Sequence, residues 1–260
     1  MKARSRPGFP ARLDRAAEPA SPAAPSLAAV GAAARVARAP TPQGLGLDSQ
    51  AVRLAMVQKL AAQGIGDPRV LDAMGRVERH RFVDTALATQ AYEDTSLPIG
   101  LGQTISKPGV VARMAELLLA GRRERPGRVL EIGTGCGYQA AVLSLLVQEV
   151  YSIERLRGLH EKARENLRPL RLPNVHLLFG DGMMGYVQGA PYAGIIAAAG
   201  GEAVPQAWID QLAVGGRLVA PVAANTGGAQ ALLVVDKTAA GVQHTLLEAV
   251  HFVPLKSGIA

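Results

Sequence analysis

The stretch VLEIGTGCGYQ, residues 129–139, decides the fold class of this 260-residue chain. A short apolar run leads directly into Gly133, Gly135 and Gly137, and a helical pattern follows at 138–147. Glycine lets the backbone turn sharply and approach a ligand without a Cβ in the way. The stretch therefore predicts a strand, a tight turn and a helix, with a nucleotide-like ligand above the turn.

The spacing of the glycines indicates which nucleotide. Dinucleotide enzymes use G-x-G-x-x-G, in which the third glycine allows close packing of the helix. This chain has Tyr138 at that position, which is too large for such packing. A ligand without a pyrophosphate does not need a phosphate-cradling helix end, so the departure favours S-adenosyl-L-methionine over NAD.

The rest of the chain after residue 121 alternates between short apolar runs and helical stretches. Helices are predicted at 138–147, 156–168 and 205–212, and strands at 128–132, 149–153, 175–179, 193–198, 217–222, 230–235 and 246–252. Such alternation means a parallel sheet covered on both faces. No helix separates the last two strands, which are expected to pair as an antiparallel hairpin at one edge. We expect an α/β, Rossmann-like, doubly wound and mostly parallel sheet.

Helical signals precede this core. Asp48-Ser49 can cap a helix with Val52, Met56 and Leu60 on one face. Asp67-Pro68 opens a second helix, and after a loop Pro108 starts a third. We therefore divide residues 48–260, taken as one domain, into an N-terminal helical subdomain on the substrate side at 48–120 and a cofactor-binding core at 121–260.

Residues 1–47 are expected to form a disordered tail outside the core. Residues 1–42 hold 14 Ala and 7 Pro with one aromatic residue, Phe9, so they offer little apolar surface to offset the entropy of ordering. They also carry seven basic and two acidic residues, which account for most of the net charge of +7. The remaining chain is nearly neutral, which argues against nucleic-acid binding by the domain.

Composition excludes several other classes. The single cysteine rules out a disulfide framework and fits a reducing cytoplasm, and the five histidines lack the spacing of a metal site. No apolar run approaches the length that spans a membrane. No sustained heptad pattern is evident, so a monomer is expected.

Acidic residues end or follow three successive strands. Glu154 follows the second strand of the core, where an acid can accept hydrogen bonds from ribose hydroxyls. Asp181, in the FGDG turn after the third strand, can meet the adenine amino group. Glu131, near the first glycine, is positioned to meet the methionine amino group. Each alone could be a loop acid or a helix cap, but together they support a cofactor site at the carboxyl edge of the sheet.

The motifs EIGTGCGYQ, GDG at 180–182 and YEDTSLPIGLGQTISKP at 92–108 together resemble the protein-L-isoaspartate O-methyltransferases. RHRFV at 79–83 and HFVPL at 251–255 fit the same family. The resemblance runs from about residue 48 to residue 258. It implies a Rossmann-like fold and the transfer of the S-adenosylmethionine methyl group to the α-carboxylate of L-isoaspartyl residues in damaged proteins. The methyl ester then closes to a succinimide, whose hydrolysis returns part of it to aspartate.

The resemblance also implies site residues. Ser106 would be the active-site residue, with its hydroxyl donating to the substrate carboxylate, although its place before Pro108 also suits a helix cap. Thr104 and Val253 would complete the substrate clamp. The full set expected to bind the cofactor is Gln103, Glu131, Gly133, Thr134, Gly135, Gly137, Glu154, Asp181 and Gly182. No general base is expected, because a carboxylate is already ionised at neutral pH.

Several positions depart from the family pattern, among them Met183-Met184 after the GDG motif and Cys136, which stands where serine is common. The fourth strand of the core usually begins with an acid, where this chain has Ala193, and Lys107 stands where glutamine is frequent. Two alternatives stay open. One is a class I methyltransferase with another acceptor, which would not need the LPIGLGQTIS segment. The other is a non-catalytic protein that binds the cofactor without turnover.

Overall fold

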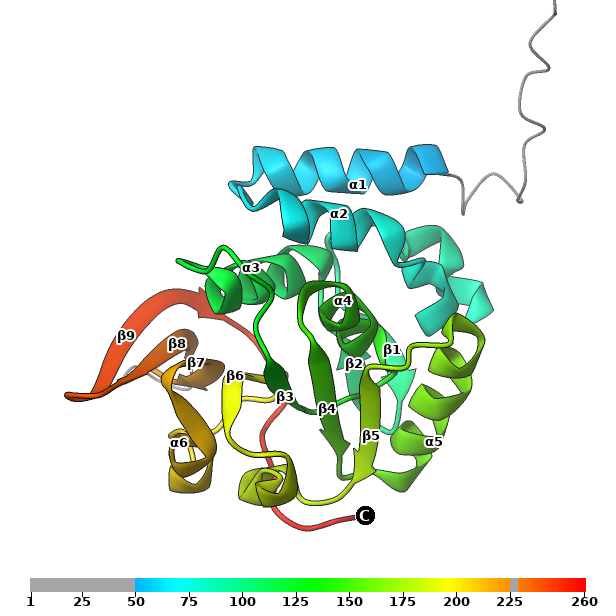
Figure 1. The fold of residues 1–260 in the computed structure, drawn as a ribbon. Coiled ribbons are helices and arrows are strands. Elements are labelled where there is room, and N and C mark those ends of the chain that lie inside the picture. The colour runs from blue at the N-terminus through cyan, green and yellow to red at the C-terminus, as the bar shows by residue number, and fades with distance from the viewer. Residues whose placement is uncertain (1–49, 225–228) are drawn as a thin grey trace, which may run out of the picture. The chain divides into compact units, whose positions relative to one another are not determined.

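The structure, a computed structural model, describes residues 50–224 and 229–260, and a seven-stranded sheet forms its centre (Figure 1). The strand order is β5-β4-β3-β6-β7-β8-β9. The strands from β5 to β7 run parallel, and β8 and β9 are antiparallel to their neighbours. The strands are β3 (Arg128–Ile132), β4 (Glu149–Glu154), β5 (Val175–Phe179), β6 (Tyr192–Ala197), β7 (Leu212–Ala223), β8 (Gln230–Thr238) and β9 (Gly241–Val250). The predicted α/β sheet with an antiparallel edge hairpin is confirmed.

Helices cover both faces of this sheet. On one face α3 (Pro108–Leu119), α4 (Tyr138–Leu146) and α5 (Arg157–Leu167) share one hydrophobic core, to which Leu118, Leu143 and Leu159 belong. On the other face α6 (Gln206–Gln211) packs Trp208 against a second core. Short 3₁₀ turns, η3 (Arg168–Leu170), η4 (Gly182–Met184) and η5 (Val187–Gly189), complete the connections. The sheet is therefore doubly wound, as the strand–helix alternation predicts.

The N-terminal part is helical, also as predicted. It contains α1 (Gln50–Ala62), α2 (Pro68–Arg76), η1 (Arg79–Phe82) and η2 (Thr85–Gln90). Asp67 caps α2, because its side chain accepts a hydrogen bond from the Arg69 backbone N–H. The expected cap at Asp48-Ser49 and the expected tail at 1–47 lie outside the described residues. The division at residue 120 into substrate and cofactor parts stays a prediction.

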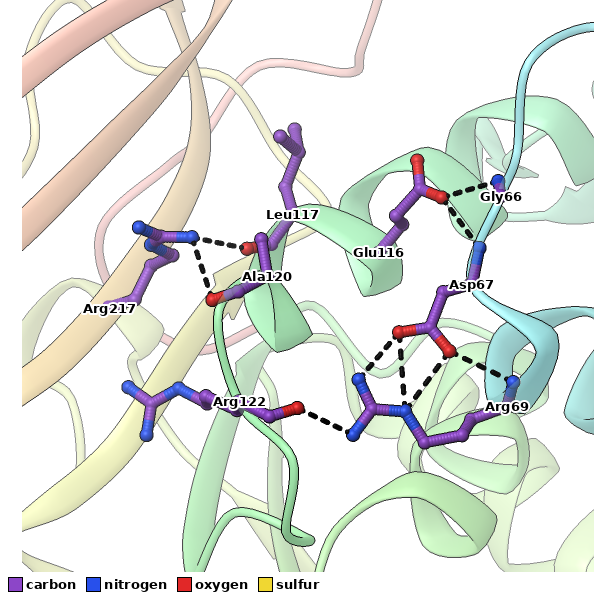
Figure 2. A network of polar contacts seen from close by, with 8 residues as sticks. All are labelled: Gly66, Asp67, Arg69, Glu116, Leu117, Ala120, Arg122 and Arg217. Carbon is purple, nitrogen blue, oxygen red and sulfur yellow. Dashed lines mark hydrogen bonds and ion pairs between the residues drawn. The ribbon is translucent and has the colours of Figure 1, made fainter.

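A network that we call the brace joins the N-terminal helices to the sheet through α3 (Figure 2). Its side chains are those of Asp67, Arg69, Glu116 and Arg217, and Arg122 takes part through its backbone carbonyl. Glu116 accepts hydrogen bonds from the N–H groups of Gly66 and Asp67 at 2.6 and 2.9 Å, and Arg69 donates to the Arg122 carbonyl.

Arg217, on β7, reaches the carboxyl end of α3 within the brace. It donates to the carbonyls of Leu117 and Ala120 at 3.1 and 3.3 Å, and it pairs with Asp236 on β8. Helix ends leave their last carbonyls without partners inside the helix. The arginine supplies those partners and neutralises the negative end of the helix dipole.

Three features differ from the sequence prediction. One is β7, which was expected at 217–222 and instead begins at Leu212. The segment before α3 was expected to be a loop, but it contains a hairpin of β1 (Leu97–Gly100) and β2 (Gln103–Ile105), whose strands are too short for a period-2 pattern to stand out. The last strand was expected at 246–252 and instead spans 241–250. Thr238 pairs with Gly241, so a tight turn starts β9 early, and Phe252 leaves the strand to bond through its N–H to the Gln230 side chain.

Among the described residues, every helix is too short or too polar to cross a membrane.

Candidate functional site

A cavity of about 280 Å³ opens at the carboxyl edge of the parallel strands. Ligands of open α/β sheets bind at this edge, where consecutive strands leave in opposite directions. Segments far apart in sequence form its wall. They are the hairpin β1–β2, the glycine loop after β3, the end of β4, the turn after β5 at Gly182, the loop after β6 and the segment around Val253. Of the predicted site residues, the lining includes Gln103, Thr104, Ser106, Gly133, Thr134, Gly135, Glu154, Gly182 and Val253.

The glycine loop connects β3 to α4 through backbone that other residues rarely adopt. Gly135 and Gly137 have φ of 57° and 91°, in the left-handed region. A Cβ on Gly137 would stand 3.0 Å from a methyl group of Leu167 on α5, so that glycine permits the close packing of α4 on α5. A Cβ on Gly135 would come within 3.2 Å of Ile99 across the cavity. The two glycines thus serve different purposes, one in packing and one in keeping the cavity open.

Glu154 ends β4 beside this loop and is 4% exposed. One carboxylate oxygen accepts from the Gly135 N–H and the other from the Leu156 N–H, both at 2.9 Å. Each carboxylate oxygen can accept more than one hydrogen bond. The side chain is therefore held in one orientation and keeps acceptor capacity toward the cavity, which suits ribose hydroxyls.

Ser106 lies between β2 and α3 on the opposite wall and is half-buried. Its hydroxyl has no hydrogen-bond partner among the described residues. The N-cap of α3 is Lys107, which makes no side-chain cap bond, and the helix end is held instead by Asp94, whose carboxylate accepts from the Gly109 N–H at 2.7 Å. The helix-cap alternative for Ser106 thus finds no support in the geometry, and its hydroxyl is available to a ligand.

The segment after β9 returns to the cavity and brings Val253 to its wall. Gly200, in the loop after β6, donates to the Val253 carbonyl at 2.9 Å and accepts from the Leu255 N–H at 2.8 Å. These bonds form a parallel bridge between Gly200 and Pro254. A strand-like pairing of two loops therefore fixes the position of Val253 at the cavity wall.

Three of the predicted cofactor residues do not line the cavity. Gly137 packs against α5, as described above. Asp181 caps η4 through the Met183 N–H, and its second oxygen accepts from the Gly258 N–H at 2.6 Å. Glu131 is fully buried on β3 and accepts a short hydrogen bond from Ser152 of β4. An interaction of Asp181 or Glu131 with the cofactor stays a prediction.

Burial raises the pKa of Glu131 to about 8, although Ser152 and Gln139 act to lower it, and the charge of Glu154 raises it further. Gln139 lies close enough to affect this pKa. Yet neither Gln139 Nε2 nor Glu131 Oε1 completes a hydrogen bond of good geometry among the described residues, although both atoms are buried. These two unsatisfied polar atoms lie directly behind the glycine loop.

Sequence reasoning missed part of the cavity wall. Gln139 is 8% exposed and lines it from the first turn of α4, and Leu101 lines it from the tip of the hairpin. Arg155 also lines it and donates to the Gly258 carbonyl at 2.8 Å. Gln139 follows Tyr138 and Arg155 follows Glu154, and the sequence had already drawn attention to both of those residues. Their place in the chain was therefore the signal that could have found them. Leu101 gave none.

Two of the departures from the family pattern, Ala193 and Lys107, lie outside the cavity lining. Ala193 is the second residue of β6, away from the carboxyl edge, and its carbonyl accepts a hydrogen bond from Arg122 at 3.2 Å. The expected acid is thus missing at the opposite end of the strand from the site. Lys107 is exposed, and its side chain forms no hydrogen bond with the cavity lining in the described part of the chain.

A doubly wound Rossmann-like sheet with a glycine loop after β3 and a carboxylate at the end of β4 is typical of class I S-adenosylmethionine-dependent methyltransferases. The sequence model for protein-L-isoaspartate(D-aspartate) O-methyltransferase (PCMT) matches residues 51–260. The chain belongs to this family.

Relatives agree with that assignment. A protein-L-isoaspartate O-methyltransferase of Methylibium petroleiphilum is 60% identical over 98% of this chain and 97% of its own length. One of Leptothrix cholodnii is 60% identical over 85% of this chain and 79% of its own. A solved protein-L-isoaspartate O-methyltransferase superposes with a TM-score of 0.72 at 28% identity, covering 79% of this chain and 66% of that chain.

A Plasmodium falciparum structure in complex with S-adenosyl-L-homocysteine has the same fold. Its TM-score is 0.67 at 23% identity, over 78% of this chain and 98% of that chain.

Proposed function

We propose that this cavity is where the chain transfers the methyl group of S-adenosylmethionine to the α-carboxylate of L-isoaspartyl residues in damaged proteins. The observation that carries the proposal is the Ser106 hydroxyl, which has no partner among the described residues and shares one cavity with the glycine loop and Glu154. Membership of the family and relatives at 60% identity support the reaction.

The residues present fit the cosubstrate. The loop around Gly135 keeps the cavity open, and the Glu154 carboxylate can accept hydrogen bonds from ribose hydroxyls. Gln103, Gly133, Thr134 and Gly182 line the same space and are proposed to bind the cofactor. When bound, S-adenosylmethionine supplies a methyl group on a sulfonium, which leaves as a neutral thioether.

The chain's own task is then to orient the carboxylate and exclude water. Ser106 donates a hydrogen bond to one carboxylate oxygen and leaves the other free, while Thr104 and the backbone at Val253 hold the substrate from the sides. Neither a base nor an acid is required, because the nucleophile is ionised at neutral pH and the leaving group is neutral. Positioning of this kind can supply several orders of magnitude in rate.

Two further points belong to the proposal. The partners are damaged proteins and peptides, and the chain acts on them as a monomer. It works in the cytoplasm, a placement that the single cysteine supports, since Cys136 is free and buried.

The test uses two peptides that differ only in carrying L-isoaspartate or L-aspartate at one position. Base-labile methyl transfer to the isoaspartyl peptide alone is expected. Equal transfer to both peptides would indicate a broader carboxyl methyltransferase. Cofactor binding with no transfer to either would reject the repair function.

A further inference from the structure

A chain of three polar side chains runs from the cavity wall into the core. Thr134, in the glycine loop, lines the cavity, and its hydroxyl lies 2.6 Å from that of Ser152 on β4. Ser152 in turn donates to Glu131 on β3. Ser152 and Glu131 are both 0% exposed, and Glu131 does not line the cavity. Ser152 is thus the link between a buried carboxyl group and a residue that a ligand can touch.

The direction of the hydrogen bonds depends on the charge of Glu131, because each hydroxyl has a single proton to donate. An ionised carboxylate only accepts, so Ser152 donates to it and Thr134 donates to Ser152. Thr134 then presents only lone pairs to the cavity. A protonated Glu131 can donate to Ser152, which reverses the chain and frees the Thr134 proton toward the cavity.

The cosubstrate and its product both carry an ammonium group at the methionine end, and an ammonium group only donates. We propose that Ser152 is a positioning residue that couples the charge of Glu131 to the cofactor through Thr134, so that binding of the ammonium group ionises Glu131. This coupling rests on the proposed function of the cavity. It adds a residue that no motif in the sequence singles out.

The groups around Glu131 place its pKa where a bound ligand can change its protonation. Ser152 and Glu154 face it from β4, Gln139 from α4, and Ile196 is its register neighbour on β6. Glu154 is the charged group among them, and it opposes ionisation. With a pKa of about 8, raised first by burial, Glu131 is mostly protonated at pH 7 in the free protein. A ligand that requires the ionised form must then release a proton.

The measurement is calorimetric titration of the full chain with S-adenosylhomocysteine at pH 7, in two buffers of different ionisation enthalpy. The wild type is expected to release close to one proton per ligand, and its affinity to rise by no more than about tenfold per pH unit up to pH 8. Glu131→Gln should release none, and Ser152→Ala should lose most of the release.

The matched control is Ser144→Ala. Ser144 is a buried serine, 4% exposed, whose hydroxyl donates to the Ala141 carbonyl within α4. That variant should release protons as the wild type does. Thr134→Val serves as a second test, because it removes the hydroxyl at the cavity end and keeps the side-chain shape. It should also lose the release.

Absence of proton release in the wild type would overturn the coupling. Full release in both Ser152→Ala and Thr134→Val would overturn it too, since Glu131 would then act on the ligand directly. Methyl transfer to the isoaspartyl peptide is measured in parallel. Release without transfer would reject the repair function and keep the coupling, whereas transfer without release would reject the coupling alone.

Discussion

The two ends of α3 differ in how their polar groups are used. At the carboxyl end, the brace gives partners to the carbonyls of Leu117 and Ala120 through Arg217 (Figure 2). At the amino end, Asp94 caps the backbone, while the neighbouring Ser106 hydroxyl is left without a partner among the described residues. A half-buried hydroxyl without a partner in the chain is free to donate to a bound carboxylate. The carboxyl end of α3 is thus held by side chains of other elements, whereas its amino end adjoins the hydroxyl that we propose binds the substrate.

The largest effect should come from the amino end. Ser106→Ala removes the donor expected to hold the substrate carboxylate, and methyl transfer to the isoaspartyl peptide should fall by about 10²-fold. Thermal stability should be unchanged, because the hydroxyl bonds to nothing in the described chain. Steady-state kinetics and thermal melting measure the two quantities. Loss of stability with unchanged transfer would reverse the assignment of this end of α3.

Arg217→Ala should have the opposite profile. It removes the ion pair with Asp236 and the partners of two helix-end carbonyls, at a cost of about 3 kcal/mol in the free energy of unfolding. Transfer per folded molecule should change little. Denaturant unfolding gives the stability, and activity below the transition gives the function. A variant with wild-type stability would show that the brace does not support α3.

A third test concerns the buried carboxyl group behind the cavity. The pKa of Glu131 is about 8 in the folded protein and near 4.5 when unfolded, so the folded state holds the proton over a wider pH range. Its contribution to stability is full below about pH 4.5 and is lost as pH rises through 8, by about 2 kcal/mol between pH 6 and 8. Glu131→Gln should remove this dependence, measured as the difference in unfolding free energy between the two proteins. Parallel pH curves would contradict it.

The smallest effect should come from the cap at the amino end of α3. Asp94→Ala leaves the Gly109 N–H without its acceptor, at a cost of about 1 kcal/mol in stability. Because Ser106 lies two residues before the start of this helix, KM for the peptide should also rise by a few-fold. Asp94→Asn keeps an acceptor oxygen and should behave nearly as the wild type. Equal effects of the two substitutions would show that charge rather than the hydrogen bond matters there.

Much of this fold could be predicted from local sequence patterns. The glycine loop, β3 to β6 and the helices between them follow from periodicity and from residues such as Gly135 and Asp67, whose effect on the backbone acts within one turn. Family membership, too, follows from short motifs. The hairpin β1–β2 was missed because a three-residue strand has no period to detect, and the early start of β9 depended on a turn closed by Gly241.

The sequence by itself determined the class of fold, the cofactor type and the identity of Ser106 as a candidate. Only the tertiary structure decided that Glu131 lies behind the cavity rather than in it, that Asp181 bonds to Gly258, and that Ser152 joins Thr134 to Glu131. The physical reason is distance along the chain. Asp181 and Gly258 are 77 residues apart, Thr134 and Ser152 are 18 apart, and Ser152 and Glu131 are 21 apart. A strand pattern gives the face that a side chain occupies, but not the polar group that it contacts on a neighbouring segment.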